Sequence, residues 1–95
     1  MVKYAPEERG MSAMRLRKQE IGTRNVVGAR VEARRKELGM KQKELLALLQ
    51  EQGIEINASG LSKLEGQIRS VPDYELIALA KALDVSIPRL LGLEE

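Results

Sequence analysis

Two groups of hydrogen-bonding side chains lie in the middle of the chain, and the first of them suits contacts with an anion. The first group is the run Lys41, Gln42 and Lys43, which we expect in the first turn of a helix. At that place a side-chain amide and free backbone N–H groups can both reach a phosphate oxygen. A second set of donors, expected on a later helix, comprises Ser59, Ser62 and Lys63.

The chain lacks several of the residue types that most often carry out catalysis. The sequence contains no His and no Cys, so the commonest general base, the commonest metal ligand and any thiolate or disulfide are missing. It also has no glycine-rich phosphate loop and no paired carboxylates in an expected cleft. We therefore expect no enzyme, no cofactor and no metal site. The absence of Cys also favours the cytoplasm.

The composition indicates one small all-α domain. The chain has 95 residues, no Phe or Trp and only two Tyr, so its core must be built from aliphatic side chains. Leu, Ala, Glu, Lys and Arg are good helix formers. The longest apolar run is residues 45–49, far short of the roughly 20 residues of a membrane span. The N-terminus lacks the apolar stretch of a signal peptide, and we expect no membrane association.

The chain divides into an N-terminal arm and a helical domain. Residues 1–24 lack sustained apolar periodicity, and we interpret them as a flexible basic arm. Residues 25–95 read as five short helices in a compact domain. The first of these begins after Asn25 as N-cap and ends before Gly39, which suits a left-handed backbone. Its apolar face is expected to carry Val27, Val31 and Leu38.

The other helix limits follow from the same signals. The second helix is expected at about 41–51, and the third runs from Ala58 to about Glu65 with Asn57 as its N-cap. Pro72 is expected in the first turn of the fourth helix, and Ser86 caps the fifth. Because Leu61 and Leu64 must point inward, the third helix should present Ala58, Ser59, Ser62 and Lys63 outward.

Charge is distributed unevenly along the chain. Residues 1–24 have six basic and three acidic residues, and residues 25–43 have six basic and two acidic. Residues 44–95 have four basic and nine acidic residues. The asymmetry fits either an anionic partner for the basic half or an ordinary solvated charged surface.

Three stretches carry a resemblance to a known family. They are GARVEARRKELGMKQKEL at 28–45, LSKLE at 61–65 and VPDYELIALAKALDVS at 71–86. In this order and spacing they resemble Cro/repressor-type (XRE-like) helix-turn-helix domains, and the resemblance covers residues 27–92. It implies a compact five-helix lambda-repressor-like fold whose third helix binds the major groove of double-stranded DNA.

The resemblance also implies roles for single residues. Gln42 would clamp the DNA backbone, and the positions that match Ala58, Ser59 and Lys63 reach base edges. Lys63 can donate to guanine O6 and N7, Ser59 can bond almost any base, and Ala58 can touch a thymine methyl. The alternative, that Lys63 contacts only phosphate or nothing at all, as is usual for exposed lysines, is equally open. None of the three is a bidentate reader such as Arg or Gln.

Arg35 and Glu65 have a structural role in the family, where this pair ties the first helix to the recognition helix. Five other polar residues are expected beside the DNA-binding surface. They either contact phosphate or belong to an ordinary solvated charged surface. They are Arg34, Lys41, Lys43, Gln67 and Arg69.

The chain departs from the family between the second and third helices. Gln42 and Glu65 are 23 positions apart, which is longer than in the compact motif. Gln50 stands where the compact turn has Gly, and Leu46 replaces the small residue usually found where the two helices touch. Together these changes predict an altered docking of the third helix and a wider helix separation. Gly60 is unusual inside a helix, where it costs about 1 kcal/mol relative to Ala.

The expected function is sequence-specific binding of double-stranded DNA by a transcriptional regulator. A module of this size reads few bases, so we expect a homodimer on half-sites about 34 Å apart. The alternative is an antitoxin-like protein-interaction module in which DNA binding is secondary or lost. The C-terminal apolar residues serve either as the dimer face or only as core, and they are Ile87, Leu90, Leu91 and Leu93.

Overall fold

The computed structural model describes residues 24–94, and within this range the chain is all-helical. The predicted arm falls almost entirely in residues 1–23, outside the described residues. The helices are α1 (Gly28–Glu37), α2 (Gln42–Glu51), α3 (Ala58–Glu65), α4 (Asp73–Leu83) and α5 (Ile87–Leu90). The predicted all-α class is confirmed for this part of the chain.

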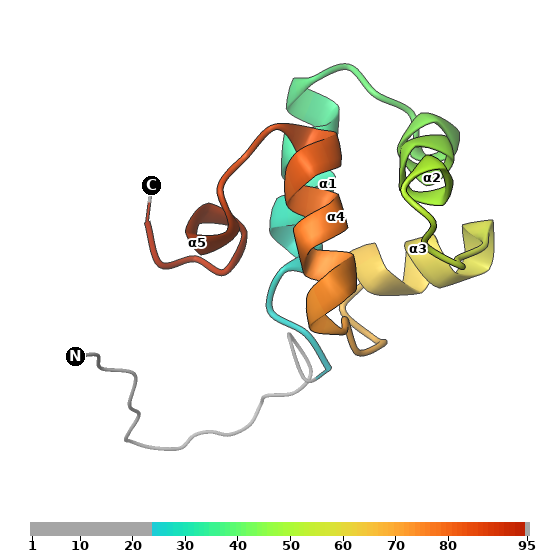
Figure 1. Ribbon diagram of the computed structural model, residues 1–95. Coiled ribbons are helices and arrows are strands. Elements are labelled where there is room, and N and C mark those ends of the chain that lie inside the picture. Colours follow the sequence, from blue (N-terminus) through green and yellow to red (C-terminus); the bar gives the residue numbers. More distant parts are fainter. Residues whose placement is uncertain (1–23, 95) are drawn as a thin grey trace.

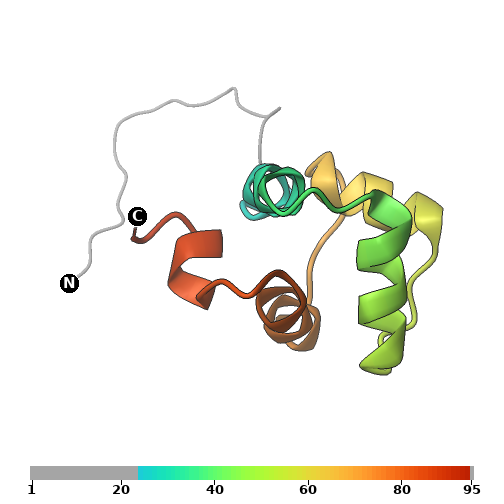
Figure 2. The same ribbon diagram turned by 90° about the horizontal axis from the view of Figure 1, so that it is seen from above.

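The helices are arranged around a central pair. α1 and α4 lie side by side and run in the same direction (Figure 1). α2 and α3 lie on one side of this pair and α5 on the other, as the view from above also shows (Figure 2). Of the helices between residues 24 and 94, none combines the length and apolar character that crossing a bilayer requires.

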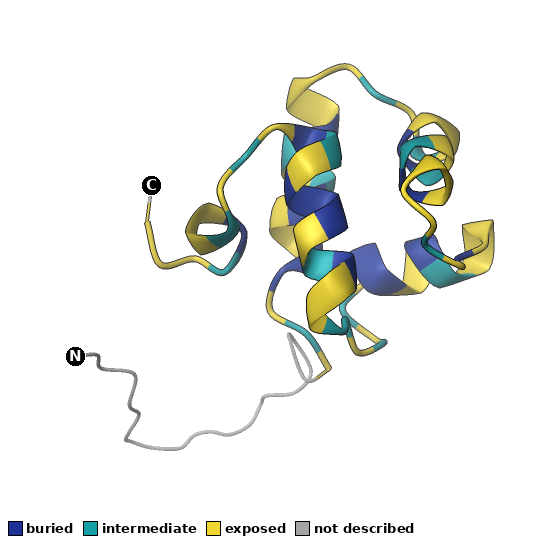
Figure 3. Ribbon diagram, in the orientation of Figure 1, coloured by how far each residue is buried: buried dark blue, intermediate teal, exposed yellow. Residues whose placement is uncertain are grey.

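The core lies where α1, α4 and the inner sides of α2 and α3 meet (Figure 3). Leucines dominate it, as the composition predicts, and α3 contributes Leu61 and Leu64, which are 1% and 0% exposed. Leu38 was expected on the buried face of the first helix, but this is wrong, because it is 42% exposed. α1 ends at Glu37, and Leu38 is its C-cap residue, one position beyond the last helical residue.

The limits of α3 match the prediction and have a clear local cause. The side-chain oxygen of Asn57 accepts a 2.7 Å hydrogen bond from the N–H of Gly60, which satisfies a donor of the first turn. Ser86 likewise accepts from the N–H of Arg89 at the start of α5. Gly39, after α1, has a φ of +68°, the left-handed conformation that the sequence predicts there.

Two expected helix starts shift by one or two residues. α1 begins at Gly28 with Val27 as N-cap, and Asn25 acts from outside the helix. The side-chain oxygen Oδ1 of Asn25 accepts from the N–H groups of Val27 and Gly28, at 3.0 and 2.8 Å. Pro72 is the N-cap of α4 rather than a first-turn residue, because its backbone is still extended.

The start of α1 packs directly against the end of α3. A Cβ atom added to Gly28 would overlap the carbonyl oxygen of Leu64 and lie 2.8 Å from that of Glu65. Only glycine permits this approach, which places the N-terminus of α1 over the last carbonyls of α3. Asn25 reinforces the junction by donating to the carbonyl oxygens of Leu64 and Arg69, at 3.1 and 2.7 Å.

Candidate nucleic-acid interface

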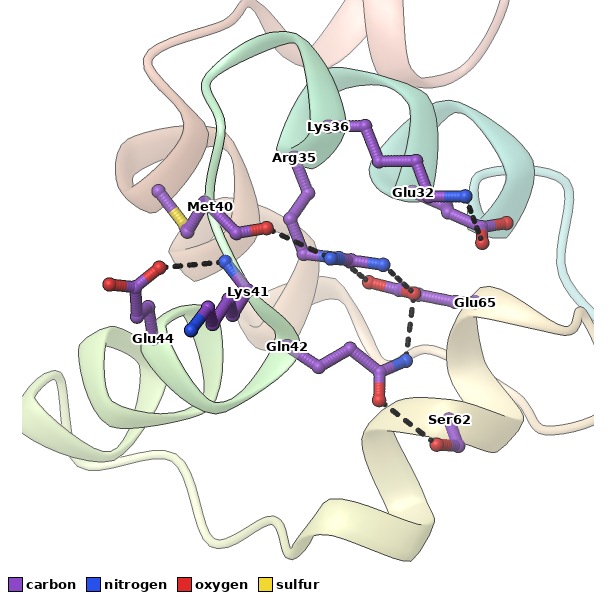
Figure 4. Close-up of polar contacts among 9 residues, drawn as sticks. All are labelled: Glu32, Arg35, Lys36, Met40, Lys41, Gln42, Glu44, Ser62 and Glu65. Carbon is purple, nitrogen blue, oxygen red and sulfur yellow. Dashed lines mark hydrogen bonds and ion pairs between the residues drawn. The ribbon is translucent and has the colours of Figure 1, made fainter.

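A buried ion pair fixes α3 relative to α1 (Figure 4). Arg35 donates from Nε and Nη2 to the two carboxylate oxygens of Glu65, at 2.7 and 3.0 Å. Its Nη1 donates to the carbonyl oxygen of Met40, at 2.9 Å. The hydrogen bonds to Glu65 raise the pKa of the Arg35 guanidinium against the opposing effect of burial, so this group stays charged. Charge-assisted bidentate pairs of this kind set geometry as well as energy.

Gln42 extends the network from α2. Its Nε2 donates to Oε1 of Glu65 at 2.9 Å, and its Oε1 accepts from the Ser62 hydroxyl at 3.3 Å (Figure 4). Both ends of the amide are therefore used within the protein. The sequence predicts a phosphate clamp here, but in this arrangement only the backbone N–H of Gln42 is free of the network.

The exposed face of α3 is small and polar. Ala58, Ser59, Ser62 and Lys63 are all exposed, whereas Leu61 and Leu64 are buried. The structure therefore brings the four predicted outward residues together on one side of a short helix. On the opposite side of the helix, the buried leucines and the hydrogen bonds of Glu65 fix it to the rest of the domain.

The start of α2 lies beside this face and has a mixed charge. Lys41 and Lys43 are exposed, as expected for residues that meet an anion. The Glu44 carboxylate accepts a 2.7 Å hydrogen bond from the backbone N–H of Lys41. A carboxylate at a helix N-terminus stabilises the helix, but it also opposes the approach of a phosphate there. The spacing of Lys41 and Glu44 could have predicted this contact.

Arg34 lies away from α3 and has another partner. Its Nε donates to the carbonyl oxygen of Leu83 at 2.9 Å and its Nη2 to that of Asp84 at 3.1 Å. Nη1 pairs with Glu37 at 3.1 Å. The guanidinium thus satisfies carbonyls at the C-terminus of α4, where a cation is favoured. All three guanidinium nitrogens of Arg34 therefore have partners within the protein.

The loop between α3 and α4 carries two predicted DNA-contact residues, Gln67 and Arg69, and both bond to other parts of the protein. Arg69 donates to both carboxylate oxygens of the buried Glu75, at 2.7 and 3.1 Å. These hydrogen bonds raise the pKa of Arg69 against the effect of burial. Gln67, whose φ is +65°, donates from Nε2 to the carbonyl oxygen of Asn25 at 3.2 Å. Both side chains fix the loop, and their partners, Glu75 and Asn25, are not predicted by the sequence.

A hollow opens between the first turns of α2 and the start of α3. It has a volume of about 330 Å³. The residues around it come from both helices, and they are Lys41, Gln42, Lys43, Leu46, Ala58 and Leu61. It includes Leu46, the residue whose size predicts a wider helix separation.

Gly60 lies beside the turn that precedes α3. A Cβ atom at this position would lie 3.2 Å from Cγ1 of Ile56 and 3.2 Å from the Asn57 side-chain oxygen. The glycine therefore gives room to the N-cap and to the turn before α3.

Comparisons with known proteins give no relative for this chain. No family model matches it, and neither a curated protein nor a solved structure matches it.

Proposed function

We propose that this chain is a sequence-specific, double-stranded DNA-binding transcriptional regulator of the Cro/repressor helix-turn-helix type. The single observation that supports this best is the exposed face of α3. It presents Ala58, Ser59, Ser62 and Lys63 on a helix that the buried Arg35–Glu65 pair holds in a fixed orientation. A groove-reading helix needs this combination of short outward side chains and rigid support.

The proposed binding mode follows from the dimensions of an α-helix and of the DNA major groove. The major groove of B-DNA is about 12 Å wide and admits one α-helix. With α3 in the groove, Lys63 donates to guanine O6 and N7, Ser59 bonds a base edge and Ala58 contacts a thymine methyl. The short side chains let the helix backbone approach the bases closely.

Phosphate contacts are proposed for the start of α2. Lys41 and Lys43 are exposed there, and the backbone N–H of Gln42 belongs to the first helical turn. Arg34, Gln67 and Arg69 support the fold through the hydrogen bonds described above. The DNA surface we propose is therefore smaller than the sequence predicts.

A surface this small reads few bases, so we propose a homodimer on two half-sites about 34 Å apart. Leu93, near the C-terminus, is 66% exposed and is available to a dimer face. The regulator would act in the cytoplasm and would need no cofactor and no catalytic residue.

Selection of bound fragments from a random duplex DNA pool at physiological salt tests this function. We expect enrichment of a motif with two-fold symmetry, its half-sites about one helical turn apart. Retention that is weak, salt-sensitive and without any enriched motif would reduce the interaction to non-specific electrostatics and contradict the proposal.

A second candidate function is an antitoxin-like protein-interaction module with secondary DNA binding. Three observations favour it: the exposed Leu93, the internal use of the Gln42 amide, and the Glu44 carboxylate at the start of α2. Failure of the selection, with a stable complex between this chain and a protein encoded beside it, would support this second function.

A further inference from the structure

The hollow between α2 and α3 has an apolar floor and a cationic rim. Leu46, Ala58 and Leu61 supply the apolar atoms, and Leu46 and Ala58 are not buried by the rest of the chain. The volume of about 330 Å³ exceeds that of a leucine side chain, so the hollow has room for one. Water in contact with this floor is released when an apolar group covers it.

Two ammonium groups flank the floor. Lys41 and Lys43 both line the hollow and are exposed. Neither forms an ion pair with a residue of the described part of the chain, and no carboxylate lines the hollow. The Glu44 carboxylate is bonded to the backbone N–H of Lys41 and lies outside the lining. An occupant whose negative charges meet the two lysine ammonium groups on either side of an apolar group therefore complements this surface.

The hollow is poorly suited to a small molecule. Ligand pockets usually combine an apolar wall with a few convergent polar groups that fix orientation. Here the one amide in the lining, that of Gln42, is already bonded to Glu65 and Ser62. A peptide does not need such a group, because it extends beyond the hollow and contacts the neighbouring face of α3.

We propose that the hollow binds an acidic peptide segment of a protein partner, with a leucine-sized side chain on the floor and flanking carboxylates on Lys41 and Lys43. The same lysines and Ala58 belong to the proposed DNA surface, so this partner excludes DNA. Only this exclusion rests on the proposed function, since the peptide contact depends on the hollow alone.

The contact can be tested by titrating the ¹⁵N-labelled full chain with the peptide acetyl-Gly-Glu-Leu-Glu-Glu-amide. We expect saturable shifts of the amide signals of Lys43, Leu46, Ala58 and Leu61. Replacing the peptide leucine by alanine should weaken binding about tenfold, because most of the buried apolar area is lost. Replacing its glutamates by lysines should abolish binding.

Two matched variants distinguish binding in the hollow from non-specific attraction between charges. Ala58→Met fills the hollow and should weaken the leucine peptide about tenfold, whereas Ala47→Met, on an exposed position of α2, should leave binding unchanged. Thermal unfolding of each variant shows that it is folded. Equal binding of the leucine and alanine peptides, or equal effects of the two variants, would overturn the proposal.

The remaining outcomes distinguish this inference from the proposed function. Peptide binding at the hollow by a chain that binds no DNA would overturn the DNA function and support the inference. DNA binding without any peptide binding would overturn the inference alone. If the same amide signals shifted when the protein was concentrated without peptide, the hollow would bind a second copy of this chain. That result would overturn the proposal of a separate protein partner.

Discussion

The guanidinium of Arg35 and the carboxylate of Glu65 meet in two parallel hydrogen bonds, 2.7 and 3.0 Å long, between α1 and the last residue of α3. Both residues are buried, and Gln42 adds a third bond from α2. This one carboxylate therefore joins α1 to α2 and α3, the two helices that carry the proposed DNA surface. Its loss should alter stability and the orientation of α3 together.

Arg35→Met should lower the free energy of unfolding by about 3–5 kcal/mol, because the Glu65 carboxylate is left buried without its cation. Urea denaturation measures this value. Lys36→Met is the matched control, because it breaks only the exposed pair with Glu32 and should cost less than about 1 kcal/mol. Equal costs for the two variants would show that the Arg35 pair does not hold the helices.

Gly28→Ala should destabilise the domain by about 1–3 kcal/mol or more, because the added methyl group overlaps backbone carbonyls at the end of α3. Gly60→Ala is the matched comparison, because it adds the same methyl group to a glycine inside α3. Its methyl would lie at 3.2 Å from its nearest neighbours, a small strain that the helix preference for Ala offsets, so the change should stay within about 1 kcal/mol. Melting temperatures in the opposite order would contradict the described junction of α1 and α3.

Leu64→Ala should cost about 2–5 kcal/mol, because Leu64 is 0% exposed and its removal leaves a cavity under α3. Leu38→Ala deletes the same atoms from a side chain that is 42% exposed, so its effect should be far smaller. Chemical denaturation of both variants makes the comparison. An unchanged stability of the Leu64 variant would show that α3 is wrongly placed.

The sequence predicts the helices well because their causes are local. Asn57 caps α3 three residues before the N–H that it accepts from, so its role can be read from neighbours in the chain. The inward positions of Leu61 and Leu64 follow from the helical period in the same way. These two signals predict both the limits of α3 and its exposed face.

The side-chain partners of the polar residues could not be predicted from local signals. Arg34 reaches Leu83, which is 49 positions away, and Asn25 reaches Arg69 across 44 positions. Each contact depends on how α1 packs against α4 and the loop after α3. The sequence shows only that these groups can form hydrogen bonds, so the inward use of the Gln42 amide was not foreseen.

Lys63→Ala should weaken binding to a selected duplex by about 1–3 kcal/mol and relax the base preference at one position of the site. The matched control is Lys81→Ala, an exposed lysine in the last turn of α4, which should leave affinity unchanged. Fluorescence anisotropy over a series of salt concentrations measures both. A uniform loss over all sequences, with a salt slope smaller by about one, would assign Lys63 to a phosphate.

The most direct test of the central claim, that the exposed face of α3 contacts duplex DNA, is an amide-resolved NMR titration of the full chain. A short duplex of mixed sequence at low salt is sufficient, since non-specific contacts use the same surface. We predict shifts at Ser59, Ser62 and Lys63 and at the start of α2, with the signal of Lys81 unchanged. Shifts confined to other helices, or no shifts at low salt, would contradict the claim.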